Sequence, residues 1–270
     1  MVAKFRNVEP SASMLRRLRQ LFVAVPVVAA TLTGCADDEI DPTACDAPIV
    51  YRVNQVQWPA NHEQARTIGF DLDGNGVVDN QLGALAVSLD NYFVEPFDLS
   101  GSATAQMVRR VAWDLAVQQC PSDRVLVMIN GGDPIAGTSI DGVIDARGVG
   151  GEVPLAALAD PTGTMADPGW RASKASALRL VASGDQLVGD VGLAPAHDDV
   201  SSAVVAAMTA FVDSRKQEQP ELLEVFDTDG DGTISYTEIS ESTLAKSMLA
   251  ADLVDLDATS MAVAIVATRL

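Results

Sequence analysis

The hydrophobic positions along the chain follow two periods, and they predict strands in some stretches and helices in others. Residues 49–58 (IVYRVNQVQW) are rich in β-branched and aromatic side chains, which is typical of a strand. Residues 124–130 (RVLVMIN) form a short apolar run that ends at a pair of glycines, so we expect a buried strand there. Residues 177–193 alternate on both sides of a Ser-Gly-Asp turn, which predicts a β-hairpin. Its same-face apolar sets are Leu178 and Leu180 in the first arm, and Leu187, Val191 and Leu193 in the second.

Helical spacing occurs in two longer stretches. Residues 102–119 place apolar side chains four apart, and residues 200–216 carry an apolar face, so both are expected to be amphipathic helices. Residues 131–171 are rich in glycine, aspartate and proline and predict long loops with short strands. We therefore expect an α+β protein, with an antiparallel β-rich domain over residues 49–197 and a helical region over residues 198–270. The apolar positions of the two helices are Met107, Val111 and Leu115 in the first, and Val204, Val205, Met208, Phe211 and Val212 in the second.

The N-terminal segment has the organisation of a secretory signal peptide. Residues 14–19 (MLRRLR) are basic, and residues 21–32 (LFVAVPVVAATL) are apolar before a small-residue ending. An apolar core of about twelve residues is too short to cross a bilayer, which requires about 20. We expect residues 1–34 to be removed on export, and the acidic residues 35–48 to form a tether before the first domain.

The end of this segment, Leu32-Thr33-Gly34-Cys35, resembles the lipobox of bacterial lipoproteins. That resemblance implies cleavage before Cys35 and attachment of lipid to its thiol, which would anchor the protein to a membrane. By the sorting pattern of the same family, Ala36 implies the outer membrane. The alternative is an ordinary signal peptide, with Cys35 in a disulfide with another thiol.

Acidic residues dominate the charge of the chain. The 18 basic and 37 acidic residues give a formal net charge of −19. The expected signal peptide holds five basic residues and one glutamate, so 13 basic and 36 acidic residues would remain, a net charge near −23. Such a surface repels nucleic acid and attracts cations, so nucleic-acid binding is excluded as a function.

Cysteine usage agrees with an oxidising compartment. Besides Cys35 the chain has only Cys45 and Cys120, and an even pair in an exported protein is typical of one disulfide. The alternative is two free, buried thiols. With no CxxC motif and only two histidines, His62 and His197, a zinc site of histidine and cysteine ligands is not expected.

Residues 226–238 (FDTDGDGTISYTE) carry the strongest chemical signal. Counted as a twelve-residue loop, they place aspartates at positions 1, 3 and 5, a glycine at 6 and a glutamate at 12. Three carboxylates, the position-7 carbonyl, a water held at position 9 and a bidentate glutamate supply the six to eight oxygens that Ca²⁺ prefers. The candidate ligands are Asp227, Asp229, Asp231, Thr233, Ser235 and Glu238.

With helix-like runs before and after the loop, residues 220–249 resemble the EF-hand family. The resemblance implies a helix–loop–helix that binds calcium, here at the C-terminal end of the α+β fold. The alternative is an acidic loop without a cation, in which four carboxylates would repel one another.

Residues 71–79 (DLDGNGVVD) form a second aspartate-rich loop. It repeats the first nine loop positions, but Leu82 stands at position 12, and residues 67–70 before it look strand-like. The loop either binds calcium with help from another segment or is a turn held by Asp and Asn hydrogen bonds. Its candidate ligands are Asp71, Asp73, Asn75, Val77 and Asp79. A third stretch, residues 255–260, has lost the position-6 glycine and is expected to be an empty partner.

Signals for catalysis are weak. The chain has no G-x-S-x-G elbow and no phosphate-binding P-loop, and each histidine stands alone. Asp141 and Asp145 are paired carboxylates that would suit a glycosidase only if a cleft brought them together. His197 and Asp198 are expected to be a solvent-facing cluster at a helix start, although they could form an acid/base pair.

Together, the lipobox, the two loops and the β-rich middle resemble exported calcium-binding lipoproteins of myxobacteria, a resemblance that assigns no activity. We expect a lipid-anchored, exported, non-enzymatic protein in which calcium acts as a structural staple. The alternative is a calcium-stabilised hydrolase or a carbohydrate- or peptide-binding surface protein. A surface groove with Trp58, Trp113 or Trp170 would favour that alternative.

Overall fold

The structure is a computed structural model that describes residues 40–92, 98–160 and 167–270. The expected signal peptide and Cys35 lie outside the described residues. Within the described part of the chain, no helix has the length and apolar character needed to cross a membrane.

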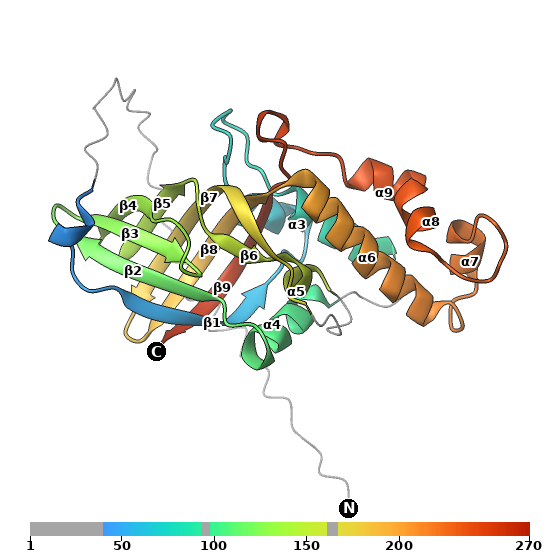
Figure 1. The fold of residues 1–270 in the computed structure, drawn as a ribbon, viewed down its shortest axis with the longest axis horizontal. Helices are drawn as coiled ribbons and strands as arrows, with labels where there is room; N and C mark the ends of the chain where they lie inside the picture. The colour runs from blue at the N-terminus through green and yellow to red at the C-terminus, as the bar shows by residue number, and fades with distance from the viewer. Residues whose placement is uncertain (1–39, 93–97, 161–166) are drawn as a thin grey trace, which may run out of the picture. The chain divides into compact units, whose positions relative to one another are not determined.

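One antiparallel sheet forms the body of the described chain (Figure 1). The strand order is β5-β4-β3-β2-β1-β9-β8-β7-β6, and β5 also pairs with β7, so the sheet closes on itself. The expected α+β class with an antiparallel β-rich body is therefore confirmed. The strands are β1 (Ile49–Gln57), β2 (Asp114–Cys120), β3 (Arg124–Ile129), β4 (Ile135–Ile140), β5 (Val143–Gly148), β6 (Glu152–Pro154), β7 (Trp170–Ser183), β8 (Gln186–Pro195) and β9 (Met261–Arg269).

Alternating side chains explain how the strands build the main hydrophobic cluster. The predicted hairpin is β7 and β8, which pair from Ser183 opposite Gln186 through Leu178 opposite Val191. All five apolar side chains of its predicted same-face sets are fully buried in that cluster. The strands predicted near residues 49–58 and 124–130 are β1 and β3.

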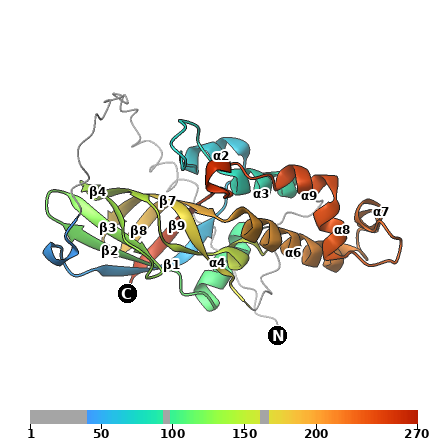
Figure 2. The same cartoon turned by 45° about the horizontal axis from the view of Figure 1, so that its top comes forward.

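Helices cover parts of the sheet and extend beyond one end of it (Figures 1 and 2). α4 packs against β1, α2 and α3 contact β9, and α6 contacts α5 and α8. α6 confirms the second predicted helix, because its five predicted apolar positions are buried. The helices are η1 (Pro42–Ala44), α2 (His62–Ile68), α3 (Gln81–Tyr92), α4 (Leu99–Arg109), α5 (Leu155–Ala159), α6 (His197–Arg215), α7 (Glu221–Phe226), α8 (Tyr236–Glu241), α9 (Thr243–Met248) and η2 (Val254–Leu256).

A disulfide joins Cys45 and Cys120, which are 75 residues apart in the sequence. It connects the segment before β1 to the end of β2, the strand that pairs with β1. The Asp46 N–H donates a hydrogen bond to the Gln119 carbonyl at 2.8 Å beside the disulfide. The covalent link therefore reinforces a place where the two segments already meet.

The prediction of one helix over residues 102–119 is wrong. α4 ends at Arg109, and β2 then pairs with both β1 and β3. Met107 is buried from α4 and Leu115 is buried from β2, so their spacing arose from two different elements.

The C-terminal region is also less helical than predicted. Residues 261–269 form β9, which lies between β1 and β8 in the sheet. Its alternate side chains Met261, Val263 and Ile265 are buried in the main cluster, as expected of a strand. The helix expected after the loop of residues 226–238 is divided at Ser242 into α8 and α9.

Candidate metal centre

The C-terminal Asp loop (residues 227–238) begins between two short helices. α7 ends at Phe226, and α8 begins at Tyr236. Phe226 and Ile239 are both buried in the main hydrophobic cluster, so a helix is anchored to the core on each side of the loop. Local sequence thus produces a helix, a loop and a second helix in succession.

Three aspartates bring their carboxylates together in this loop. Asp227, Asp229 and Asp231 each place one oxygen within 4.8 Å of the others. The Gly232 N–H donates to Asp227 at 2.8 Å, and Gly232 adopts a φ of +79°, which favours glycine. The Asp231 N–H donates to Asp229 at 3.1 Å, and the Thr233 N–H donates to Asp231 at 2.6 Å. These bonds orient the carboxylates and leave further lone pairs for a cation.

Glu238 is nearly buried and ties the two ends of the loop together. Its Oε2 accepts hydrogen bonds from the Ser235 N–H (2.8 Å) and hydroxyl (2.9 Å), and its Oε1 accepts one from the Thr228 N–H (2.6 Å). These bonds, chiefly those from Ser235, lower the pKa of Glu238 to about 2, so its carboxylate stays ionised. Glu238 is not in the group of three oxygens described above.

The N-terminal Asp loop (residues 71–79) also lies between two helices. The strand-like interpretation of residues 67–70 is wrong, because α2 extends to Ile68. Asn61 caps α2 by accepting a hydrogen bond from the Gln64 N–H, and this cap favours the helix. Only Phe70 pairs as a strand residue would, in an isolated bridge to Asp79.

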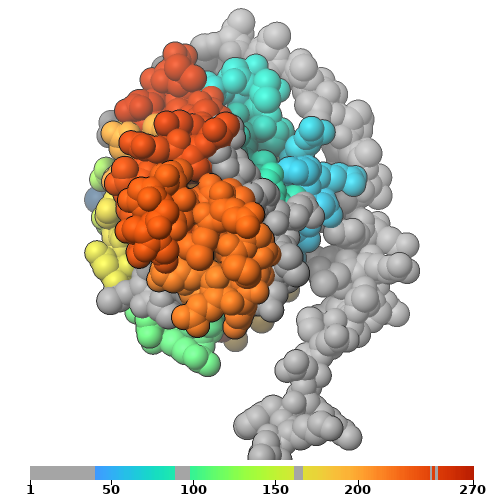
Figure 3. All heavy atoms as spheres, turned by 90° about the vertical axis from the view of Figure 1, so that its right-hand side faces the viewer, coloured from blue at the N-terminus to red at the C-terminus, as the bar shows by residue number. Residues whose placement is uncertain are grey.

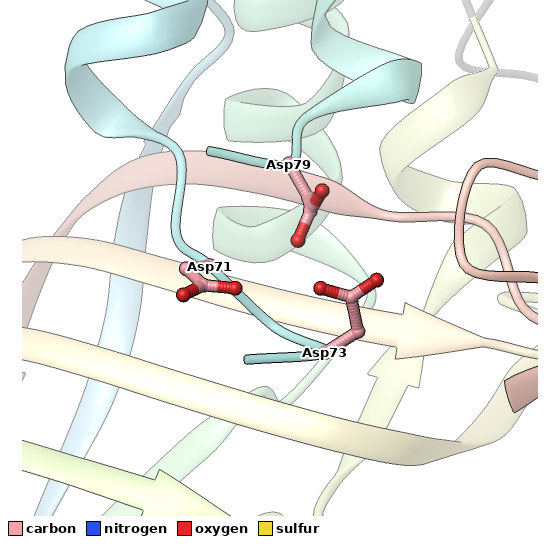
Figure 4. A group of neighbouring side chains, drawn as sticks. All are labelled: Asp71, Asp73 and Asp79. Atoms are coloured by element: carbon pink, nitrogen blue, oxygen red, sulfur yellow. The ribbon is translucent and has the colours of Figure 1, made fainter. Parts of the chain in front are cut away.

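Three carboxylates also converge in the N-terminal Asp loop, as Figure 4 shows. Oxygens of Asp71, Asp73 and Asp79 lie within 4.8 Å of one another. Asp71 Oδ2 accepts a hydrogen bond from the Gly76 N–H at 3.0 Å. The other oxygen, Asp71 Oδ1, is buried and has no hydrogen-bond partner among the described residues. Because buried polar atoms are nearly always paired, this oxygen together with the converging carboxylates fits a bound cation.

Asn75 holds the turn of this loop, and Asp79 lies among several negative charges. Asn75 Oδ1 accepts a hydrogen bond from the Val77 N–H at 2.7 Å, which holds the turn. Burial raises the pKa of Asp79, and the nearby charges of Asp73, Asp252 and Asp71 raise it further, against a hydrogen bond from the Leu72 N–H. A cation would relieve this accumulation of negative charge.

The two loops do not pair with each other in the way that EF-hands usually do. Their position-8 residues are Val78, which is 47% exposed, and Ile234, which is 3% exposed. In the described part of the chain no β-bridge joins them. Leu82, at position 12 of the first loop, is buried in the core and offers no oxygen from its side chain.

A lysine side chain from another segment contacts the third stretch, residues 255–260, which was expected to be an empty partner. The ammonium of Lys174 donates to the carbonyls of Leu256 (2.8 Å) and Asp257 (2.7 Å). It also lies 3.6 Å from the Asp257 carboxylate. The sequence pattern did not reveal this contact, because Lys174 comes from β7, far away along the chain.

Other candidate residues are placed away from any shared site. Trp113 is fully buried, and Trp58 is buried with its indole N–H donating to the Leu158 carbonyl. His197 lies at the start of α6 with its Nδ1 3.0 Å from the Thr259 hydroxyl. Asp145 is exposed on β5 and lies 3.7 Å from Arg147. These environments indicate structural roles for Trp58 and Trp113.

No family model matches the chain, and no curated protein or solved structure shows significant similarity to it. The geometry of the two Asp loops is therefore the principal guide to function.

Proposed function

We propose that the protein is an exported, lipid-anchored calcium-binding protein, in which calcium acts as a structural staple and no reaction is catalysed. The observation that carries the proposal is the convergence of Asp227, Asp229 and Asp231 in a loop between two core-anchored helices. Their hard oxygen donors suit calcium, which tolerates flexible geometry and many carboxylate ligands.

The EF-hand resemblance supplies the rest of the ligand set for this loop. The Thr233 carbonyl, a water held by Ser235 and the Glu238 carboxylate would complete the shell. The bound ion would offset the repulsion among the carboxylates and connect α7 to α8. We extend the proposal to the N-terminal Asp loop, with Asp71, Asp73, Asn75, Val77 and Asp79 as ligands. Its support is the buried, unpartnered Asp71 oxygen.

Export supports a structural role in preference to a regulatory one. A calcium sensor needs a changing concentration, whereas extracellular calcium is high and steady, and modules there commonly bind at about 10⁻⁴–10⁻³ M. The Cys45–Cys120 disulfide is compatible with an oxidising compartment. Lipid on Cys35 would hold the domain at the bacterial outer membrane.

A melting experiment tests the staple. At 100 times its dissociation constant, calcium adds about 2.7 kcal/mol to the free energy of unfolding. For a domain of this size that corresponds to about 5–11 °C in melting temperature. Chelation should remove this difference, and Glu238→Gln should abolish the part of it that the C-terminal Asp loop contributes. Glu241→Gln is a matched control, because Glu241 is exposed at the end of α8. A melting temperature that is indifferent to calcium and chelator would contradict the proposal.

The alternative of a hydrolase or a carbohydrate-binding surface receives less support. Trp58 and Trp113, two of the three tryptophans that could have marked a ligand groove, are buried. The apolar cavity beside Trp58 has a volume of only about 20 Å³, which is too small for a sugar or a peptide side chain.

A further inference from the structure

A cavity of about 400 Å³, lined by both polar and apolar side chains, lies beside the N-terminal Asp loop. Asn75 and Asp79 of the loop line it together with Asp252, which belongs to the segment that follows α9. His62 and Arg66 of α2 also line it. Figure 3 shows this red C-terminal segment beside the teal residues that follow the loop. Two segments far apart in the sequence thus face one cavity.

Hydrogen bonds from Ser260 hold the Asp252 carboxylate in place. Its Oδ1 accepts a hydrogen bond from the Ser260 N–H at 2.9 Å, and its Oδ2 accepts one from the Ser260 hydroxyl. Ser260 is fully buried. Its hydroxyl accepts a hydrogen bond from the Gln81 N–H (2.8 Å), and its carbonyl accepts one from the Leu82 N–H (2.9 Å). One buried residue therefore connects Asp252 to the first turn of α3.

That turn is where an EF-hand carries its last ligand. In this chain the position belongs to Leu82, whose side chain is 3% exposed and packs in the core. Asp252 nevertheless lines the same cavity as Asp79 of the loop. Asp252 also lies outside the group of oxygens within 4.8 Å of one another, so a water is needed to connect it to a shared ion.

We propose that Asp252 replaces the missing position-12 carboxylate and completes the cation shell of the N-terminal Asp loop through a bridging water. This inference rests on the proposed function of that loop. Its chemical basis is familiar, because position 9 of an EF-hand often contacts calcium through water. Asp252 would add a fourth carboxylate to a site that otherwise has three.

The test isolates the N-terminal Asp loop by disabling the other one. In the Asp227→Asn, Glu238→Gln background, calorimetric titration with Ca²⁺ reports the first loop. Adding Asp252→Asn should weaken binding about tenfold or more, as loss of a group that orients metal ligands typically does. Asp252→Glu keeps the charge and should stay within about threefold of the background. Asp255→Asn is the matched control, since Asp255 is exposed nearby, and it should change affinity less than about twofold.

The outcomes separate this inference from the function on which it rests. Melting in excess chelator shows whether each variant folds. Saturable binding in the background that Asp252→Asn leaves unchanged would overturn the role of Asp252 and leave the loop a calcium site. Equal losses in the Asn and Glu variants would show that Asp252 only supports Ser260, and would overturn it too. No saturable binding in the background would overturn the proposed function of the loop, and this inference with it.

Discussion

Removal of the Cys45–Cys120 disulfide is expected to act mainly on the unfolded chain. The bond closes a loop of 75 residues, and the chain-entropy model gives such a loop about 4.5 kcal/mol of stabilisation. The folded state should keep its local contacts without the bond, because β1 still pairs with β2 and the Asp46 N–H still reaches the Gln119 carbonyl.

Either Cys45→Ser or Cys120→Ser should therefore lower the free energy of unfolding by about 4 kcal/mol. At about 2–4 °C per kcal/mol for a domain of this size, the melting temperature should fall by about 8–16 °C. The double variant should be about as stable as either single variant, because all three lack the same bond.

Thermal and urea unfolding of the wild type, both single variants and the double variant measure this effect. Each is studied with the same excess of calcium, since a bound ion shifts apparent stability. Wild-type protein in a reducing agent should match the variants. Single variants that melt within about 2 °C of the wild type, or a double variant far below both singles, would refute the entropic reasoning.

Two further predictions concern pH and the membrane anchor. Burial raises the pKa of Asp190 to about 6 despite the opposing charge of Arg179. The folded state then keeps this proton to a higher pH than the unfolded chain, so the contribution of Asp190 to stability should fall as pH rises from about 4 to 6. Asp190→Asn should reduce the slope of melting temperature against pH across that range. An unchanged slope would count against a raised pKa for Asp190. Lipidated wild-type protein should fractionate with membranes and be released by detergent but not by salt, because several acyl chains give durable attachment. Cys35→Ser should be soluble or remain unprocessed; a processed variant that stays fully membrane-bound would contradict the anchor.

Local patterns predicted the elements whose side chains alternate within one segment. The hairpin of β7 and β8 and the buried face of α6 could be predicted because each pattern lies in a single continuous element. The prediction for residues 102–119 failed because apolar side chains at the end of a helix and the start of a strand share a four-residue spacing. Sheet closure and the place of β9 depend on pairing with distant strands, which no local period encodes.

The candidate sites were likewise predictable only where their residues lie close together in the sequence. Both Asp loops could be located from sequence, because their aspartates are spaced within nine or twelve residues. Asp252 and Lys174 could not be linked to any loop in advance, since they approach from distant segments. The helix before the N-terminal Asp loop was missed because its Thr and Ile residues favour strands in isolation, whereas the Asn61 cap and buried packing favour α2.

Calcium binding by the C-terminal Asp loop is the central claim, and calorimetric titration of calcium-depleted protein (residues 36–270) tests it most directly. We predict saturable binding with a dissociation constant of about 10⁻⁴–10⁻³ M. The Asp227→Asn variant should lose the contribution of this loop, and Glu241→Gln should bind as the wild type does. No saturable binding up to about 10 mM calcium, or a titration unchanged by Asp227→Asn, would contradict the account.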